Sequence, residues 1–332
     1  MKNTQVVVLA IALFYSIYQM SSQTAKSLHF DGVDDQINCG NDSSIQITGA
    51  HITLEAMVKF DAFSSHVWKG NIINKEGASP DSGYMLRAGA NGVLNFNLGN
   101  GSWNEVSTPS NTVAIGVWYH IAASYDGTIM RIYVDGVEVG IRAVSDIDIM
   151  NNSSSLYIGN WALTGNRFFN GTIDEVRIWN VARTAEEIAA NMDTEITLPQ
   201  TGLVLYYKFN QGMANGDNTS ETTVNDELGA NNGILLNFAL NGATSNWIGD
   251  TTLAISKYIK ESRISIFPNP SSDFIKISKM IKPMKYTIFN STGARVLKGK
   301  IVADAHIHIQ MLKKGLYFLR LDNKKGGKFF KK

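Results

Sequence analysis

The fold is decided by the stretch VWYHIAASYDGTIMRIYVDGVEVG at residues 117–140. One face of an extended first strand would carry Tyr119, Ile121, Ala123 and Tyr125. The Asp-Gly pairs at 126–127 and 135–136 accept the positive φ values that tight hairpin turns require. The stretch therefore predicts an antiparallel meander of strands.

The same turn signal recurs on both sides of this meander. Further Asp-Gly and Asn-Gly pairs stand at 31–32, 91–92, 100–101 and 170–171. The chain has 29 glycines, 44% hydrophobic residues and only 18% charged residues. From Ser27 to about Ile196 it is therefore predicted to form many short strands joined by tight turns. One helix follows them, because Thr184 and Glu187 have the spacing of a capping box.

The first 23 residues have the pattern of a signal peptide. Lys2 precedes an apolar run, Val6 to Tyr18, which has the length of a signal-peptide core and is short for a membrane span. We predict a signal peptide over 1–23 and no permanent transmembrane anchor; the alternative is an uncleaved N-terminal anchor. Cys39 is the single cysteine, so no intramolecular disulfide can form and the hydrophobic core must hold the exported protein together.

The net charge of +1 conceals two blocks of opposite sign. Residues 263–332 contain 16 basic and 3 acidic residues, a net charge of +13, which leaves −12 for residues 1–262. Such asymmetry indicates two units with different tasks. Nucleic acid is an unsuitable partner for the acidic block, because phosphates repel it. We predict a main domain over 24–250, a linker over 251–262 and a second domain over 263–332.

The main domain resembles the laminin-G-like (concanavalin A-like) jelly-roll domains of bacterial secreted proteins. Residues 27–192, about half of the chain, carry the resemblance. The most specific pieces are WYHIAASYDGTIMRIYVDGVEVG at 118–140 and the run from LYIGN at 156 to FFNGTIDEVRIWNVARTAEEI, which ends at 188. The resemblance implies an all-β fold, a jelly-roll β-sandwich.

The basic block resembles the type IX secretion C-terminal sorting domains of the Bacteroidetes. The matching pieces are ISIFPNPSSDFIKIS at 264–278, YTIFNSTGARVLKGK at 286–300 and LKKGLYFLRLDNKKGGKFFKK at 312–332. The resemblance implies a small Ig-like β-sandwich that is recognised by the outer-membrane export machinery of a Gram-negative bacterium. It therefore implies a secreted or surface-displayed protein, and leaves open whether the domain is cleaved and replaced by a lipid anchor.

Residues 198–250 resemble a piece of the jelly roll found at the unusual end. GLVLYYKFNQG at 202–212 is similar to the strand that opens many relatives, whereas this chain begins its domain at SLHFDG, residues 27–32. We therefore expect 198–250 to complete the sandwich as a permuted strand followed by a loop.

Jelly rolls also include glycan-cleaving enzymes, so catalytic motifs would be expected if this chain were one of them. The hydrolases of this fold use a Glu-x-Asp-x-(x)-Glu pattern on one strand, which points all three carboxylates to one face. The nearest strings, SDIDIM at 145–150 and GTIDEV at 171–176, do not fit it, and there is no Gly-x-Ser-x-Gly elbow. We predict no catalytic and no cofactor-binding residues.

A structural calcium ion is predicted from carboxylates in two segments. The turn after the first strand offers Asp31, Asp34 and Asp35, and Asp174 begins a later strand. Calcium prefers carboxylate, carbonyl and water oxygens. The family resemblance implies that the two segments lie close together, so Asp31 and Asp174 are the predicted metal ligands. Alternatively, the aspartates of the turn only cap the backbone through their side chains.

Three tryptophans in polar loops are the candidate ligand contacts: Trp68, Trp103 and Trp161. Sugars have apolar faces and polar rims, so their sites combine an aromatic ring with amides and carboxylates. The alternative is that these rings cover the edges of the sandwich. The predicted function is a non-catalytic surface module that binds a glycan or matrix-like ligand; the alternatives are an adhesive or structural protein with protein ligands and, third, a glycoside hydrolase.

Overall fold

The computed structural model describes residues 26–161, 166–249, 266–277, 283–290, 293–302, 305–321 and 326–332. The predicted signal peptide, 1–23, and the predicted linker, 251–262, lie outside the described residues. Within the described residues, no helix is long and apolar enough to cross a membrane.

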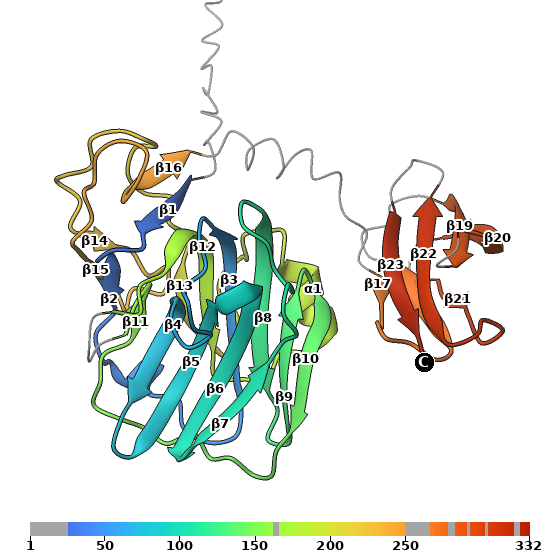
Figure 1. Ribbon diagram of the computed structural model, residues 1–332, viewed down its shortest axis with the longest axis horizontal. Helices are drawn as coiled ribbons and strands as arrows, with labels where there is room; N and C mark the ends of the chain where they lie inside the picture. The colour runs from blue at the N-terminus through green and yellow to red at the C-terminus, as the bar shows by residue number, and fades with distance from the viewer. Residues whose placement is uncertain are drawn as a thin grey trace, which may run out of the picture.

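The first of two large sheets, sheet A, has eight antiparallel strands (Figure 1). Their order is β10 (Val137–Ala143), β9 (Ile129–Val134), β8 (Trp118–Tyr125), β3 (Ile52–Phe60), β12 (Asn170–Trp179), β1 (Lys26–Asp31) and β16 (Trp247–Gly249), with β13 (Leu203–Tyr207) also paired to β12. The antiparallel meander predicted for 117–140 is confirmed as β8, β9 and β10.

The second sheet, sheet B, packs against sheet A and also has eight strands. Their order is β14 (Thr223–Val224), β15 (Gly233–Leu236), β2 (Gln36–Asn38), β11 (Tyr157–Ile158), β4 (Asn71–Gly77), β5 (Asp81–Gly89), β6 (Val93–Gly101) and β7 (Trp103–Ser107). Alternate residues of both sheets point into one shared core, for example Leu54 and Ala56 from β3 and Leu94 and Phe96 from β6. Each fully buried Leu or Phe side chain of this core stabilises the fold by about 1.5–3 kcal/mol.

Residues 198–250 supply strands to both sheets. In sheet A, β13 pairs with β12 and β16 pairs with β1, where Trp247 lies opposite Leu28 and is fully buried. In sheet B, β15 pairs with β2, with Leu235 opposite Ile37. The segment is therefore built into the sandwich by strand pairing at three places.

The outer face of sheet A is covered by the segment that contains the helix α1 (Ala185–Asn191). The predicted capping box is confirmed, because the Thr184 side chain accepts from the Glu187 backbone N–H and the Glu187 carboxylate accepts from the Thr184 N–H. Ile188 of the helix packs against Ala122 and Tyr133 of the sheet. Two short 3-10 helices, Ser43–Ile45 and Ala90–Gly92, complete the local structure of the sandwich.

A buried ion network lies between sheet A and this covering segment. The Glu55 carboxylate contacts Arg183 at 2.7 Å, His120 at 3.2 Å and Arg177 at 3.6 Å, and all four side chains are buried. Burial alone would raise the pKa of Glu55, but the hydrogen bond and charge of His120 and the charges of the two arginines hold it at about 2. The network thus buries and pairs the charged side chains on the outer face of sheet A.

The C-terminal domain consists of two further sheets around its own core. One contains β17 (Ile266–Phe267), β18 (Phe274–Ile277) and β21 (Ile307–His308). The other, sheet C, has the order β20 (Arg295–Ile301), β19 (Met284–Asn290), β22 (Gly315–Leu321) and β23 (Gly326–Lys331). Ile275, Ile288, Ile309 and Phe329 are fully buried between them. The predicted fold class, a jelly-roll sandwich followed by a small β-sandwich, is confirmed.

Candidate ligand-binding face

Amide side chains line the outer face of sheet B, where β4, β5, β6 and β7 lie side by side (Figure 1). On β6, the inward residues Leu94, Phe96 and Leu98 alternate with polar residues. This alternation places Asn95 and Asn97 on the outer face, because successive side chains of a strand point to opposite faces.

The strand register gathers residues into two rows across the four strands, all polar except Met85 and all buried except Ser107 and Glu105. One row is Asn71, Arg87, Asn95 and Ser107; the other is Asn74, Met85, Asn97 and Glu105. Glu76 of β4 continues the same face beside Asn74. We call this surface the amide face: Asn71, Asn74, Glu76, Met85, Arg87, Asn95, Asn97, Glu105 and Ser107.

Hydrogen bonds hold the amide face in place. The Asn95 Oδ1 accepts from Arg87 Nε at 2.7 Å and also from Asn97 Nδ2, and Asn95 Nδ2 donates to Ser107 Oγ at 2.8 Å and to Glu105 Oε2 at 3.2 Å. The Asn97 Oδ1 is buried and has no hydrogen-bond partner in the described structure. The amide face therefore contains one strong hydrogen-bond acceptor that is unsatisfied, although its other amides are hydrogen-bonded to one another.

Two of the predicted tryptophans meet at one end of the amide face. The Arg167 guanidinium lies 3.6 Å from the ring centroid of Trp161 and 5.0 Å from that of Trp68, and it donates to Glu76 at 3.1 Å. The Arg167 backbone carbonyl accepts from the backbone and side chain of Asn71, which ties this corner to β4. Cation–π contact of this kind fixes the planes of both rings.

This aromatic corner has unused donors as well. Trp161 is 8% exposed and Trp68 is 37% exposed. The buried Nε1 of Trp161 and the buried Nε of Arg167 have no acceptor among the described residues. With Asn97 Oδ1, three buried polar atoms at this surface are unsatisfied, and each costs free energy until something binds it.

The charges of the face balance. Arg87 and Arg167 supply two guanidinium groups, and Glu76 and Glu105 supply two carboxylates. Burial lowers the pKa of Arg87 to about 10 and also lowers the pKa of Arg167. Because about 10 is still far above neutral pH, Arg87 stays charged and can donate to a ligand from its terminal nitrogens.

Trp103 lies on the edge strand β7, opposite Gly99, and is partly exposed. It is three strands away from β4, which at about 4.8 Å per strand is about 14 Å. The structure thus brings Trp68 and Trp161 together and leaves the third predicted contact at the far edge of the same sheet.

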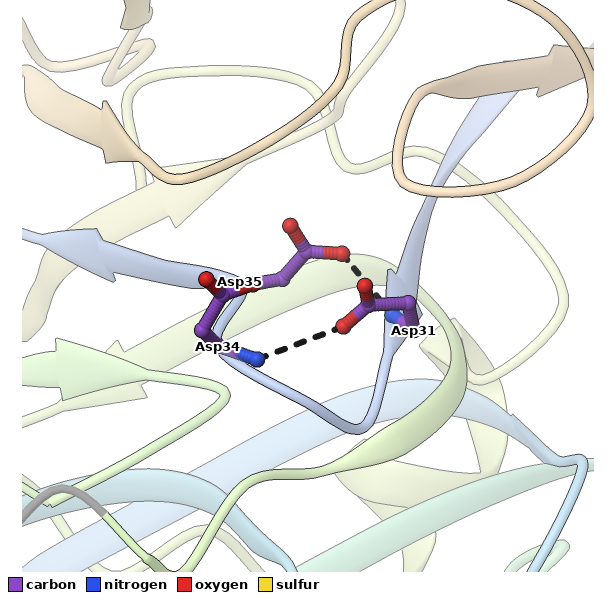
Figure 2. Close-up of side chains that lie close together, drawn as sticks. All are labelled: Asp31, Asp34 and Asp35. Carbon is purple, nitrogen blue, oxygen red and sulfur yellow. Dashed lines mark hydrogen bonds between the residues drawn. The ribbon is translucent and has the colours of Figure 1, made fainter.

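The acidic turn after β1 brings three carboxylates together (Figure 2). Asp31, Asp34 and Asp35 each offer an oxygen within 4.8 Å of the others. Asp31 Oδ1 accepts from the Val33 N–H at 2.8 Å, and Asp35 accepts from the Asp31 N–H at 2.8 Å and from the Ser245 hydroxyl at 2.7 Å. Burial raises the pKa of Asp35 to about 7, and the neighbouring carboxylates add to the rise.

The two predicted calcium ligands are not neighbours. Asp31 lies opposite Asn170 on β12, and Asp174 is four residues further along that strand, about 13 Å away at 3.3 Å per residue. Asp174 is buried and accepts from the Glu175 N–H. Three clustered carboxylates suit the oxygen chemistry of calcium, so the turn alone fits such an ion. Calcium itself stays a prediction.

Comparison with known proteins assigns a family to each of the two domains. Residues 31–189 match the profile of the Concanavalin A-like lectin/glucanases superfamily, in its laminin-G form, and residues 265–332 match the profile of the secretion system C-terminal sorting domain. Residues 31–189 thus form a concanavalin A-like sandwich, and residues 265–332 form a type IX sorting domain. The sorting domain indicates export and a secreted or surface location.

Individual relatives of this sandwich cover parts of the chain. A solved protein from Bacteroides ovatus, to which carbohydrate binding has been ascribed, is 26% identical with a TM-score of 0.50, over 64% of this chain and 58% of that one. Pappalysin-1 of Mus musculus is 39% identical over 83 residues, and that of Homo sapiens is 36% identical over 92 residues. The matches span 24% and 26% of this chain but only 5% and 6% of the pappalysins.

Several residues of the amide face were missed by the sequence reasoning. NFNLGN at 95–100 shows the alternation of amides with apolar residues that gives β6 its polar outer face. That signal was available. The positions of Arg87 and Arg167 had no comparable local signal, because they come from the register of β5 and from a distant loop.

Proposed function

We propose that this sandwich is a non-catalytic module that binds a glycan on the amide face and is displayed outside the cell by its sorting domain. The observation that carries the proposal is a set of three unsatisfied buried atoms near the exposed Trp68 ring: Asn97 Oδ1, Trp161 Nε1 and Arg167 Nε. Sugar hydroxyls both donate and accept, so they can satisfy all three, while the Trp68 ring takes the apolar face of a sugar.

The carboxylates of the face do not suit hydrolysis. A glycosidase needs two carboxyl groups about 5 Å or about 6.5–9.5 Å apart. Glu76 is on β4 and Glu105 is on β7, three strands apart, which corresponds to about 14 Å. Glu76 is moreover held by Arg167 at 3.1 Å. The similarity to the Bacteroides ovatus protein also supports binding over catalysis.

A glycan array probed with the full chain tests the proposal. We expect binding to a restricted set of glycans, and loss of at least tenfold in signal for Trp161→Ala and for Asn97→Ala. Trp118→Ala is the matched control, because Trp118 is a partly exposed tryptophan on the outer face of sheet A.

Four results would speak against the proposal. If no glycan binds, or if the control loses binding equally, the amide face is not a glycan site. Capture of a protein ligand that depends on the same two residues would favour the adhesive alternative. Release of reducing sugar from a bound glycan would favour a hydrolase.

A further inference from the structure

One face of the sorting domain combines exposed aromatic rings with cations. On β22, Tyr317, Leu319 and Leu321 point into the core, which turns Leu316, Phe318 and Arg320 outward. On β23, Phe329 is fully buried between the exposed residues Lys328 and Phe330. Both alternations expose the same side of sheet C, because the two strands are paired in register.

The register of sheet C joins the apolar residues into a stripe. Phe318 lies opposite Phe289 of β19, and Leu316 lies opposite Phe330 of β23. Directly opposed side chains on one face have Cβ atoms about 4.5–5.5 Å apart, and diagonal neighbours are within reach of aromatic rings. The stripe therefore runs continuously over three strands, with Phe318 44% exposed and Phe330 47% exposed.

Cations surround this stripe. Arg320 lies 5.2 Å from the Phe289 ring centroid, Lys328 is opposite Phe318, and Arg295 is opposite Phe289. Lys298 and Lys300 of β20 extend the same face. The four strands contain no Asp or Glu. We call this the basic-aromatic face: Phe289, Arg295, Lys298, Lys300, Leu316, Phe318, Arg320, Lys328 and Phe330.

We propose that the basic-aromatic face is the surface by which the export machinery holds the sorting domain, and that its partner is an acidic protein surface with an apolar centre. Aromatic residues and arginine are enriched at the centres of protein interfaces, and a single sign of charge around them attracts and orients a partner of the opposite sign. The family assignment gives the domain its sorting role; the geometry assigns that role to one of its faces.

The small apolar area of the stripe favours a protein partner over a lipid surface. Phe318 and Phe330 keep only 44% and 47% of their surface exposed. Binding to a bilayer surface scales with the apolar area that enters it, to a depth of about 5–10 Å, whereas an apolar centre within a charged rim is the arrangement of protein interfaces.

The test is secretion of the full chain by a bacterium that has a type IX system. Two double variants disturb the face: Lys298→Glu with Lys300→Glu, and Phe318→Ser with Phe330→Ser. Two matched controls change the same chemistry outside it: Lys313→Glu with Lys314→Glu, in the exposed turn before β22, and Val302→Ser with Met311→Ser, at exposed apolar positions. We expect the secreted fraction to fall more than tenfold for the face variants, with accumulation in the periplasm, and to stay near wild type for the controls.

Normal secretion of both face variants, or equal losses in face and control variants, would overturn the proposal. Thermal melting of each purified full chain separates a docking defect from misfolding, and Lys298→Gln with Lys300→Gln replaces the charge reversal if that variant does not fold. Binding to vesicles of phosphatidylglycerol and phosphatidylcholine is measured in parallel. If the wild-type chain binds them and the face variants do not, a lipid surface takes the place of the protein partner and the proposal is wrong.

Discussion

The two outer faces of the sandwich both carry polar side chains, but their polar atoms have different partners. On sheet A, Glu55 is buried among His120, Arg177 and Arg183 beneath the segment that contains α1. On sheet B, Asn97 keeps a buried oxygen without a partner in the described structure. A buried charge must be paired to be tolerated, whereas a buried amide oxygen without a partner can accept a hydrogen bond from water or from a ligand. The first face therefore holds the fold, and the second is the face that we propose for binding.

The largest loss of stability should come from removal of the C-terminal strands of the sandwich. A chain that ends at Pro199 loses β13 and β16 from sheet A, and with β13 it loses the Tyr206 hydroxyl that donates to Glu175 at 2.7 Å. We expect it to be unfolded, or to melt at least ~10 °C below a chain that ends at Asp250. Circular dichroism during heating measures this; equal melting of the two chains would show that residues 198–250 do not complete the sandwich.

The next largest effect should come from the buried ion network. Glu55→Gln leaves the two arginines short of a negative charge, and we expect a loss of about 3–5 kcal/mol in the free energy of unfolding. Glu105→Gln, at an exposed position of the amide face, should change it by less than about 0.5 kcal/mol. Urea unfolding of the two variants gives both numbers, and similar losses would remove the distinction between the faces.

The same network predicts a pH dependence. The pKa of Glu55 is about 2 in the folded chain, below that of a free glutamate. Its contribution to stability is therefore present above the pKa of the unfolded glutamate, 4.5, and is lost as the pH falls toward 2. Acid unfolding of the wild-type chain should show this loss, and Glu55→Gln should not. An identical acid profile for both chains would contradict the assigned role.

Sequence patterns predicted the local structure well and the site only in part. Asp-Gly turns and alternation gave the meander at 117–140, and the capping box placed α1, because both depend on residues close in the chain. The ligand face depends on strand order and register, which bring Asn74 of β4 level with Asn97 of β6. For the same reason the sequence alone could not show whether Asp174 lies beside Asp31. The register of β12 against β1 decides which of its residues faces Asp31, and a shift of one residue changes the answer.

A smaller effect on stability is expected at the acidic turn, where, among the described residues, the three carboxylates lie beside one another instead of beside cations. The folded pKa of Asp35, about 7, lies above that of a free aspartate, about 4. The contribution of Asp35 to stability is therefore greatest below about pH 4 and falls as the pH rises toward 7. Calcium should oppose this fall, because a bound cation favours the charged carboxylates.

Melting temperatures between pH 4.5 and 8, with calcium and with a chelator, measure the effect, and Asp35→Asn should flatten the profile. Calcium-dependent stabilisation that is lost in Asp31→Ala and kept in Asp174→Ala would place the ion in the turn alone. No calcium dependence in the wild-type chain would refute the predicted ion, and equal loss in the two variants would place both residues at one site.

The most direct test of the account is ligand binding at the amide face. The measurement is calorimetric titration of the best glycan from the array into the full chain and into the double variant Asn97→Ala, Trp161→Ala. The account predicts binding at least tenfold weaker in the double variant, a difference of about 1.4 kcal/mol or more, at a temperature where both chains are folded. Loss of the buried Trp161 ring by itself lowers the melting temperature of the variant. Unchanged affinity, or a loss of affinity that only accompanies unfolding, would contradict the claim that sheet B carries the binding face.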